Sequence, residues 1–306
     1  MVQPVSASQK IPKPKWLKVP FPGGPRYAWI KDKVVSLELS TVCEEARCPN
    51  IGECWNGGTA TFMLMGDTCT RGCRFCSVHS AKEPAPLDEK EPQKLAETLG
   101  QMKLTYVVLT TVDRDDLPDQ GAGHIAGCIR AVKIKNPELL IEILIPDFRG
   151  EMPLVQKVLK AKPSVLAHNI ETVERLTDKV RDRRAGYHQS LEVLGYIKKM
   201  NPEQLTKSSI MLGLGETRDE VIQTMQDLRD QNVNFLTIGQ YLQPSTKHLA
   251  VEHYVNPEEF RDLENLGQEM GFEYVASGPL VRSSYKAAEY FIERKLKNSS
   301  SGNYAT

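Results

Sequence analysis

Short apolar runs alternate with longer amphipathic segments along most of the chain. The apolar runs are rich in β-branched and large aliphatic residues and cover residues 59–65, 105–112, 139–146, 164–171, 208–216 and 234–241. Short runs that are apolar throughout are typical of parallel strands buried on both faces. Between them, apolar residues recur with helical spacing over residues 91–102, 123–134, 154–161, 187–200 and 217–231. The pattern therefore predicts repeated strand–helix units.

The number of these units determines the expected fold class. Right-handed crossovers join consecutive strands into a parallel sheet that the helices cover. Six units are too few for a closed eight-stranded barrel, so we expect an α/β fold, a partial (β/α)6 TIM-type barrel over residues 59–275. An N-terminal extension (1–58) and a short C-terminal extension (276–306) flank it. A chain of 306 residues is compatible with one such barrel.

Polar residues follow each of the six apolar runs. In parallel α/β barrels, functional residues collect at the carboxyl ends of the strands, so we expect one shared cavity there. The candidate lining residues are Thr110, Asp113, Asp147, Arg149, Asn169, Glu171, Gln240 and Gln243. Ordinary loop capping would account for any one of them, whereas a site accounts better for the whole set.

Charge and hydropathy argue against two classes of partner. The chain has 39 basic and 39 acidic residues, so no broad field attracts nucleic acid or an anionic membrane surface. No run of about 18 apolar residues is present to span a bilayer, and the amino-terminal segment lacks the apolar core of a secretory signal. We therefore expect a soluble, cytoplasmic protein. The Pro- and Lys-rich amino-terminal segment is expected to be an extended strap, with a weak organellar transit peptide as the alternative. No large apolar helix face indicates a dimer, which favours a monomer.

Six of the seven cysteines lie in two triplets. The triplets are Cys43, Cys48, Cys54 and Cys69, Cys73, Cys76. Cys128 stands alone in an amphipathic segment, where a buried structural thiol is expected. An odd, clustered set does not favour disulfides in a reducing compartment. Thiolates suit zinc or an iron–sulfur cluster, and His79 offers a fourth ligand for a Cys3His zinc site.

The second triplet carries a resemblance to a known superfamily. Its spacing is Cys-x3-Cys-x2-Cys, Phe75 precedes the last cysteine, and the loop follows the first predicted barrel strand. This arrangement resembles the radical S-adenosylmethionine (SAM) superfamily. The resemblance implies that three thiolates hold a 4Fe-4S cluster and leave one iron open for SAM, whose reductive cleavage gives a radical that removes hydrogen from an unactivated carbon.

The first triplet narrows the resemblance to the lipoyl synthase family. Its Cys-x4-Cys-x5-Cys spacing and the segments VDRDDL, PDFRG, HNIETV, GLGET, GQYLQPS and GPLVRSSY are similar to that family over residues 13–288. The resemblance implies a second, auxiliary 4Fe-4S cluster with a serine as its fourth ligand, Ser284 in preference to Ser283. From the residues alone, either serine would be interpreted as a helix N-cap.

The family's reaction would insert two sulfur atoms, at C6 and C8 of a carrier-bound octanoyl chain, with the auxiliary cluster as the sulfur donor. For SAM, the strand ends offer Thr110 and Asn169 for the methionyl part, Glu171 for the ribose and Arg184 for the carboxylate. Each of these could instead make a structural hydrogen bond or ion pair.

The implied partners are octanoylated lipoyl carrier domains of 2-oxoacid dehydrogenase E2 subunits, the glycine cleavage H protein, a ferredoxin or flavodoxin as electron donor, and an iron–sulfur carrier that rebuilds the spent cluster. Two alternatives remain at this point. A methylthiotransferase also pairs two clusters, but it requires further domains and a more basic charge. A non-enzymatic iron–sulfur carrier would explain the cysteines without explaining the polar strand ends.

Overall fold

One eight-stranded sheet forms the body of the molecule. The structure is a computed structural model and describes residues 12–19, 21–36, 40–45, 48–56, 61–102 and 104–284. In their order across the sheet, the strands are β1 (Ser40–Thr41), β2 (Thr61–Leu64), β5 (Tyr106–Thr111), β6 (Leu140–Leu144), β7 (Val165–Ala167), β8 (Leu205–Leu212), β9 (Phe235–Gln240) and β10 (Tyr274–Gly278). β1 is antiparallel to β2, and every other pairing in this sheet is parallel.

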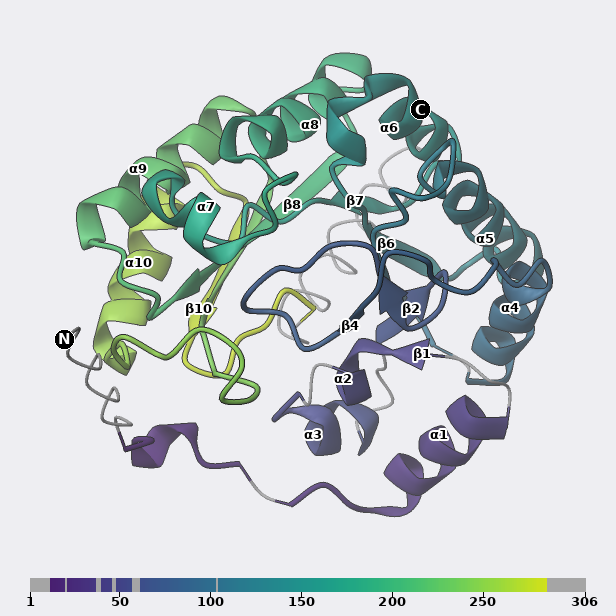
Figure 1. The fold of residues 1–306 in the computed structure, drawn as a ribbon, viewed down its shortest axis with the longest axis horizontal. Coiled ribbons are helices and arrows are strands. Elements are labelled where there is room, and N and C mark those ends of the chain that lie inside the picture. The colour runs from purple at the N-terminus through teal and green to yellow at the C-terminus, as the bar shows by residue number, and fades with distance from the viewer. Residues whose placement is uncertain are drawn as a thin grey trace, which may run out of the picture.

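Six longer helices follow the strands and form an arc around the outside of the sheet (Figure 1). They are α4 (Glu91–Met102), α5 (Ala122–Lys135), α6 (Met152–Leu159), α8 (Tyr187–Met200), α9 (Arg218–Asp230) and α10 (Pro257–Glu269). Local sequence explains their limits. α9, for example, begins at a capping box in which Thr217 and Glu220 satisfy each other's backbone N–H groups. Its buried residues Val221, Met225 and Leu228 recur at helical spacing and face the sheet.

The parallel sheet confirms the predicted partial barrel and adds a seventh parallel strand. β10 pairs with β9 in parallel, so the predicted barrel limit at residue 275 falls inside a strand. β10 is an edge strand and is buried over only part of its length. Its apolar run is correspondingly weak, which is why periodicity did not identify it. β7 is shorter than predicted, because the chain leaves the sheet after Ala167 and returns only at the isolated bridge between Glu171 and Ile210.

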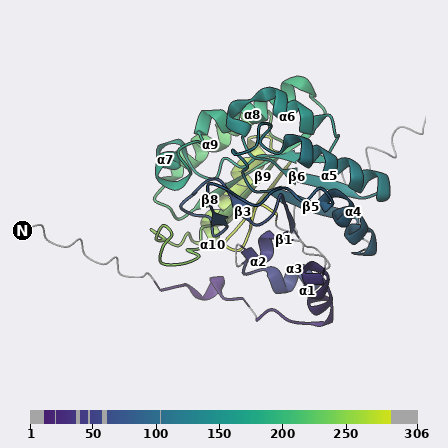
Figure 2. The ribbon, with the colours of Figure 1, turned by 45° about the vertical axis from the view of Figure 1, so that its right-hand side comes forward.

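The N-terminal extension lies across the open side of the barrel (Figures 1 and 2). Its helical elements are η1 (Lys15–Leu17), α1 (Pro25–Ser36), α2 (Val42–Glu45) and α3 (Ile51–Asn56). Leu17, Ile30 and Val34 are buried, and the Tyr27 ring lies 5.1 Å from that of Trp55. Burial of these side chains attaches the extension to the barrel.

Two further expectations concern single segments. Cys128 is fully buried in α5, as predicted. Residues 285–306 of the predicted C-terminal extension, which include Tyr285 of the GPLVRSSY segment, lie outside the described residues. Among the helices that the structure describes, none combines the length and apolar character needed to cross a membrane.

Candidate functional site

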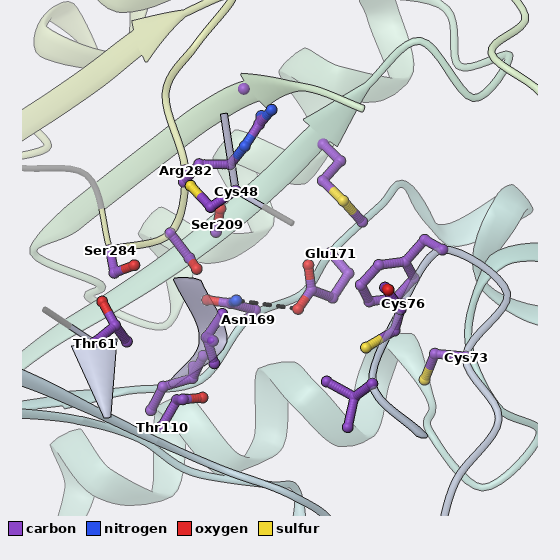
Figure 3. A pocket seen from close by; sticks show the side chains of 18 of the residues that line it. Cys48, Thr61, Cys73, Cys76, Thr110, Asn169, Glu171, Ser209, Arg282 and Ser284 are labelled. Atoms are coloured by element: carbon purple, nitrogen blue, oxygen red, sulfur yellow. Dashed lines mark hydrogen bonds between the residues drawn. The ribbon is translucent and has the colours of Figure 1, made fainter. Parts of the chain in front are cut away.

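A cavity of about 500 Å³ lies at the carboxyl ends of the barrel strands. Five of the six clustered cysteines line it: Cys43, Cys48, Cys69, Cys73 and Cys76. Figure 3 shows Cys73 and Cys76 at one side of this cavity. Cys48 and Ser284 lie at the opposite side, and Asn169 lies between the two pairs (Figure 3). The fold therefore brings all of the second triplet and two cysteines of the first, Cys43 and Cys48, to one cavity, although β2 separates the triplets in the sequence.

The loop of the second triplet is held by backbone contacts at its two ends. The short parallel strands β3 (Thr68–Cys69) and β4 (His79–Ser80) pair with each other and close the loop. Two backbone N–H groups approach the Cys69 sulfur, from Arg71 at 3.4 Å and from Asp113 at 3.3 Å. The N–H of Asp182 approaches the Cys73 sulfur at 3.3 Å. Such donors stabilise negative charge on sulfur.

Arg71, between the first two cysteines of this loop, is the centre of a buried ion network. Its guanidinium donates two 2.7 Å hydrogen bonds to the Asp147 carboxylate and bonds of 3.0 and 3.1 Å to that of Asp115. A third carboxylate, Asp113, lies 3.2 Å away. Burial and the neighbouring carboxylates raise the pKa of Asp113 to about 6, against the opposing effect of Arg71. The network attaches the cysteine loop to the ends of β5 and β6.

The first triplet is carried by short helices of the extension. Cys43 lies in α2 and Cys54 in α3, and Cys48 lies in the connection between them. The Cys48 N–H donates to the carbonyl of Cys43 at 3.0 Å, which folds this segment on itself. Cys54 packs against the core and is not among the residues that line the cavity.

A side-chain contact joins this triplet to the far end of the chain. The Asn50 amide donates a 2.7 Å hydrogen bond to the carbonyl of Leu280, which is 230 residues away in the sequence. Ser283 and Ser284 follow shortly after Leu280, and both serines line the cavity together with Cys43 and Cys48. Arg282 lines it too, and its electrostatic interaction with Cys48 reflects their proximity.

The chemistry of the two triplets fits metal–sulfur ligation. Burial raises the pKa of Cys73 to about 12 and that of Cys43 to about 11, so these thiols remain protonated unless a cationic centre binds them. The competing zinc site is not supported by the geometry, because His79 is exposed on β4 and does not line the cavity. Three cysteines in a tight loop, with N–H donors around the sulfurs, fit an iron–sulfur cluster with an open iron.

Three of the four residues predicted to contact SAM line the cavity: Thr110, Asn169 and Glu171. The Asn169 amide donates a 3.0 Å hydrogen bond to the Glu171 carboxylate (Figure 3). Glu171 has a φ of 69°, which is strained for a residue with a side chain. Its backbone is held in this conformation by hydrogen bonds to Ser209 and Met211 of β8. Burial raises the pKa of the Glu171 carboxyl.

The fourth residue, Arg184, does not line the cavity. Its guanidinium is bound by Asp182 at 2.8 Å, Asp115 at 3.2 Å and the carbonyl of Thr70 at 2.7 Å. Arg181 lines the cavity instead, and its charge acts on Glu171. Both arginines lie in the short basic segment between α7 (Thr177–Val180) and α8, and sequence spacing could not show which one faces inward.

The remaining strand-end residues divide between lining and support. Arg149 does not line the cavity, because it turns outward and pairs with Asp115 at 2.9 Å. Asp113, Asp147, Gln240 and Gln243 do line it. Gln240 has a structural role. Its side-chain NH2 group donates hydrogen bonds to the carbonyls of Leu212, Tyr241 and His253, and its side-chain oxygen accepts one from the N–H of Val255. Sequence reasoning missed Arg71 and Asn50, whose partners Asp147 and Leu280 are far away in the chain. It also missed Arg181, because its spacing does not show that it faces the cavity.

Two family models match the chain. Residues 63–228 match the model described as the Radical SAM superfamily, and residues 3–48 match the N-terminal domain of lipoyl synthase of the Radical SAM family. The first match covers the strands and helices from β2 to α9 and contains the second cysteine triplet. The second match contains Cys43 and Cys48.

Curated relatives include mitochondrial lipoyl synthase from Drosophila ananassae, 57% identical over 95% of this chain and 78% of the relative. The same protein from Aedes aegypti is 57% identical over 95% of this chain and 75% of the relative. The expectation of a cytoplasmic protein is wrong, since these relatives are named mitochondrial. That expectation came from the lack of an apolar signal, whereas organellar addresses are amphipathic segments that receptors recognise.

Solved structures share the fold at low sequence identity. Methylornithine synthase has a TM-score of 0.52 with 13% identity, and 84% of each chain is covered. HydG, a maturase of the [FeFe]-hydrogenase, has a TM-score of 0.55 with 16% identity over 70% of this chain and 50% of that one. These likenesses show the fold alone. The family models and the curated relatives show that the chain belongs to the lipoyl synthase family of the radical SAM superfamily.

Proposed function

We propose that this protein is a lipoyl synthase sulfurtransferase that inserts two sulfur atoms, at C6 and C8 of a carrier-bound octanoyl chain. Membership of the radical SAM superfamily implies SAM and one 4Fe-4S cluster. The observation that carries the further proposal is one cavity lined by the second triplet, by Cys43 and Cys48 of the first, and by Ser283 and Ser284, which with Val281 and Arg282 form the serine loop. A sulfur donor and a radical source must reach the same carbon, and a shared cavity permits this.

The residues of the cavity have separate roles in this proposal. When bound, a cluster at the second triplet supplies the electron that cleaves SAM, and an auxiliary cluster at the first triplet supplies sulfur. The proposed ligands are Cys69, Cys73, Cys76 and Cys43, Cys48, Cys54, Ser284. Asn169 and Glu171 lie between the two sets and are placed to orient SAM, with Thr110 at the end of β5 beside them.

The wall of the cavity also suits the acyl substrate. Apolar side chains contribute to it from four strands or strand ends, namely Met63, Val108, Leu144 and Ile210. Such a wall holds an alkyl chain by burial and excludes water from a carbon radical. The proposed substrates are octanoylated E2 lipoyl domains and the glycine cleavage H protein. The proposed electron donor is a ferredoxin or flavodoxin, and an iron–sulfur carrier is proposed to rebuild the spent cluster. The proposed location is the mitochondrion.

The direct test is anaerobic. The protein is reconstituted with iron and sulfide and supplied with SAM, a strong reductant and an octanoyl-lysyl peptide. We expect mass spectrometry to show a peptide that gains two sulfurs through a singly thiolated intermediate. Formation of 5′-deoxyadenosine without peptide thiolation would contradict the proposed substrate.

Two matched variants separate the roles of the two triplets. Cys73→Ala is expected to abolish 5′-deoxyadenosine formation, because only two thiolates of the second triplet remain. Cys48→Ala is expected to retain SAM cleavage and lose sulfur insertion. Sulfur insertion by Cys48→Ala would show that the first triplet does not hold the sulfur donor.

A further inference from the structure

The amino-terminal segment formed by residues 12–19 and 21–36, named here the strap, exposes large apolar side chains. Among the described residues, those on the strap are Phe21 (99% exposed), Val35 (66%), Trp16 (46%) and Trp29 (39%). The other exposed large apolar side chains, Ile134 and Met200, lie apart from each other on α5 and α8. Exposed aromatic side chains that gather on one segment are typical of protein-binding surfaces.

The strap is also positively charged. It contains six basic residues and one acidic residue, Asp32, in a chain whose net charge is zero. The basic residues are Lys13, Lys15, Lys18, Arg26, Lys31 and Lys33. Within the described part of the chain, the ion pairs include none of these six cations. Lys33 lies over the Trp29 ring, 5.9 Å from its centroid, and Lys13 lines the cavity. The exposed cations that an acidic partner would meet are therefore Lys15, Lys18, Arg26 and Lys31.

The strap is held in place and begins at the cavity. Leu17 is fully buried, and the Asn56 side chain accepts a hydrogen bond from the Tyr27 N–H at 3.3 Å. Lys13 lines the cavity itself, within electrostatic reach of Arg282. From there the strap passes outside α3 to α1 (Figure 2). A protein that delivers an acyl chain to this cavity would meet the exposed face of the strap.

We propose that the strap docks the folded carrier domain that presents the octanoyl-lysine, through an acidic surface that surrounds a contact for Phe21. This inference rests on the proposed function, since it names the surface used by its substrate. Charge on the rim of an interface mainly raises the association rate, and a central aromatic side chain contributes most to the affinity. Lys15 and Lys18, which flank Trp16, raise the association rate. Phe21 contributes most to the affinity.

The test compares a carrier protein with a short peptide. Binding of octanoylated glycine cleavage H protein to the reconstituted enzyme is measured anaerobically by calorimetry and stopped flow. Thiolation of the octanoyl-lysyl peptide is measured in parallel. We expect Phe21→Ser to raise the Kd for the H protein about tenfold. The double variant Lys15→Glu/Lys18→Glu should lower the association rate about tenfold and reduce its dependence on salt. Peptide thiolation should stay within about twofold in both, because Phe21, Lys15 and Lys18 are not among the residues that line the cavity.

Matched controls lie on the outer helix α5. Ile134→Ser removes a comparably exposed apolar side chain, and Lys135→Glu reverses an exposed charge. Neither should change H protein binding. The proposal is overturned if the strap variants bind the H protein like the wild type, or if the α5 variants weaken binding equally. It is also overturned if the strap variants change the mass in solution without changing carrier affinity, which would make the strap a contact between copies of this chain.

Failure of the proposed function gives a different result. A wild-type enzyme that never thiolates the peptide would contradict the reaction, and H protein binding would still be measurable in the same preparation. Peptide thiolation that falls in parallel with carrier binding in the strap variants would overturn the docking role alone.

Discussion

At the scale of single residues, Arg71 determines how firmly the second cysteine loop is attached to the barrel. Its side chain is 3% exposed, and it faces Asp147, which is fully buried, and Asp115, which is 3% exposed. Each of these two carboxylates accepts two hydrogen bonds from the guanidinium, a bidentate geometry that a lysine cannot reproduce. The cysteines are ligand candidates from sequence alone, whereas the role of Arg71 depends on carboxylates that follow β5 and β6.

Removing Arg71 should therefore destabilise the loop strongly. Arg71→Ala leaves the Asp147 carboxylate buried without its cation, which costs about 3–5 kcal/mol of unfolding free energy. Arg149→Ala is the matched control, because Arg149 is 47% exposed and pairs with the same network. It should cost less than about 1 kcal/mol. Anaerobic urea denaturation and iron content measure both effects, and equal losses in the two variants would contradict this role of Arg71.

At the scale of elements, the close contact between β9 and the serine loop positions Ser284. A Cβ on Gly239 would lie 2.1 Å from the carbonyl oxygen of Val281, so only glycine permits this approach. The Arg282 guanidinium donates a 2.8 Å hydrogen bond to the Gln240 carbonyl and strengthens the same contact. The packing of the loop on β9 thus determines where Ser284 lies relative to the first triplet.

Gly239→Ala should impair sulfur insertion while sparing SAM cleavage. The added methyl group displaces Val281 and with it the serine loop, and a misplacement of about 1 Å costs roughly 100-fold in rate. The amounts of 5′-deoxyadenosine and of thiolated peptide, measured in the same reaction, separate SAM cleavage from sulfur insertion. Gly127→Ala in α5 is the control, because a Cβ there meets nothing within 4 Å. Equal retention of both activities in Gly239→Ala would show that the loop tolerates the displacement.

At the scale of the whole molecule, buried polar contacts between strands and helices make stability depend on pH. His168 follows β7, and its two ring nitrogens lie 2.9 Å from the Ile145 carbonyl and from the Ser190 hydroxyl of α8. Arg181 donates to the same hydroxyl at 2.8 Å, which directs the hydroxyl proton to His168. Burial, together with the nearby Arg181, lowers the pKa of His168 from 6.5 to about 4. The ring is therefore neutral in the folded protein.

This shift predicts a loss of stability in mild acid. The unfolded chain binds a proton at His168 below about pH 6.5, and the folded protein does so only near pH 4. The free energy of unfolding is therefore unaffected by His168 above pH 6.5. It falls by about 1.4 kcal/mol per pH unit as the pH decreases from about 6.5 towards about 4. Urea denaturation of the wild type and of His168→Gln between pH 7.5 and pH 5 should show a smaller pH slope for the variant. Equal slopes would contradict the assignment, and His188→Gln on α8 is the exposed-histidine control.

Much of the fold was predictable from the sequence, and so was the clustering of the candidate ligands. The run at 105–112 predicts β5, and the amphipathic segments at 91–102 and 187–200 coincide with α4 and α8. These elements follow from local periodicity, because a buried strand or an amphipathic helix needs only its own residues to show its pattern. The spacing of Cys69, Cys73 and Cys76 is equally local, since one tight loop holds all three.

The tertiary structure alone decided the contacts between distant segments. It added β10 to the sheet, turned Arg181 inward rather than Arg184, and joined Asn50 to Leu280 across 230 residues. No local pattern specifies such contacts, because they depend on where the sheet places segments that are far apart in the chain. The sequence by itself therefore determined most strands and helices of the barrel and the cysteine triplets of this protein. Only packing around the sheet decided that the second triplet, Cys43 and Cys48 of the first, and the serine loop share one cavity.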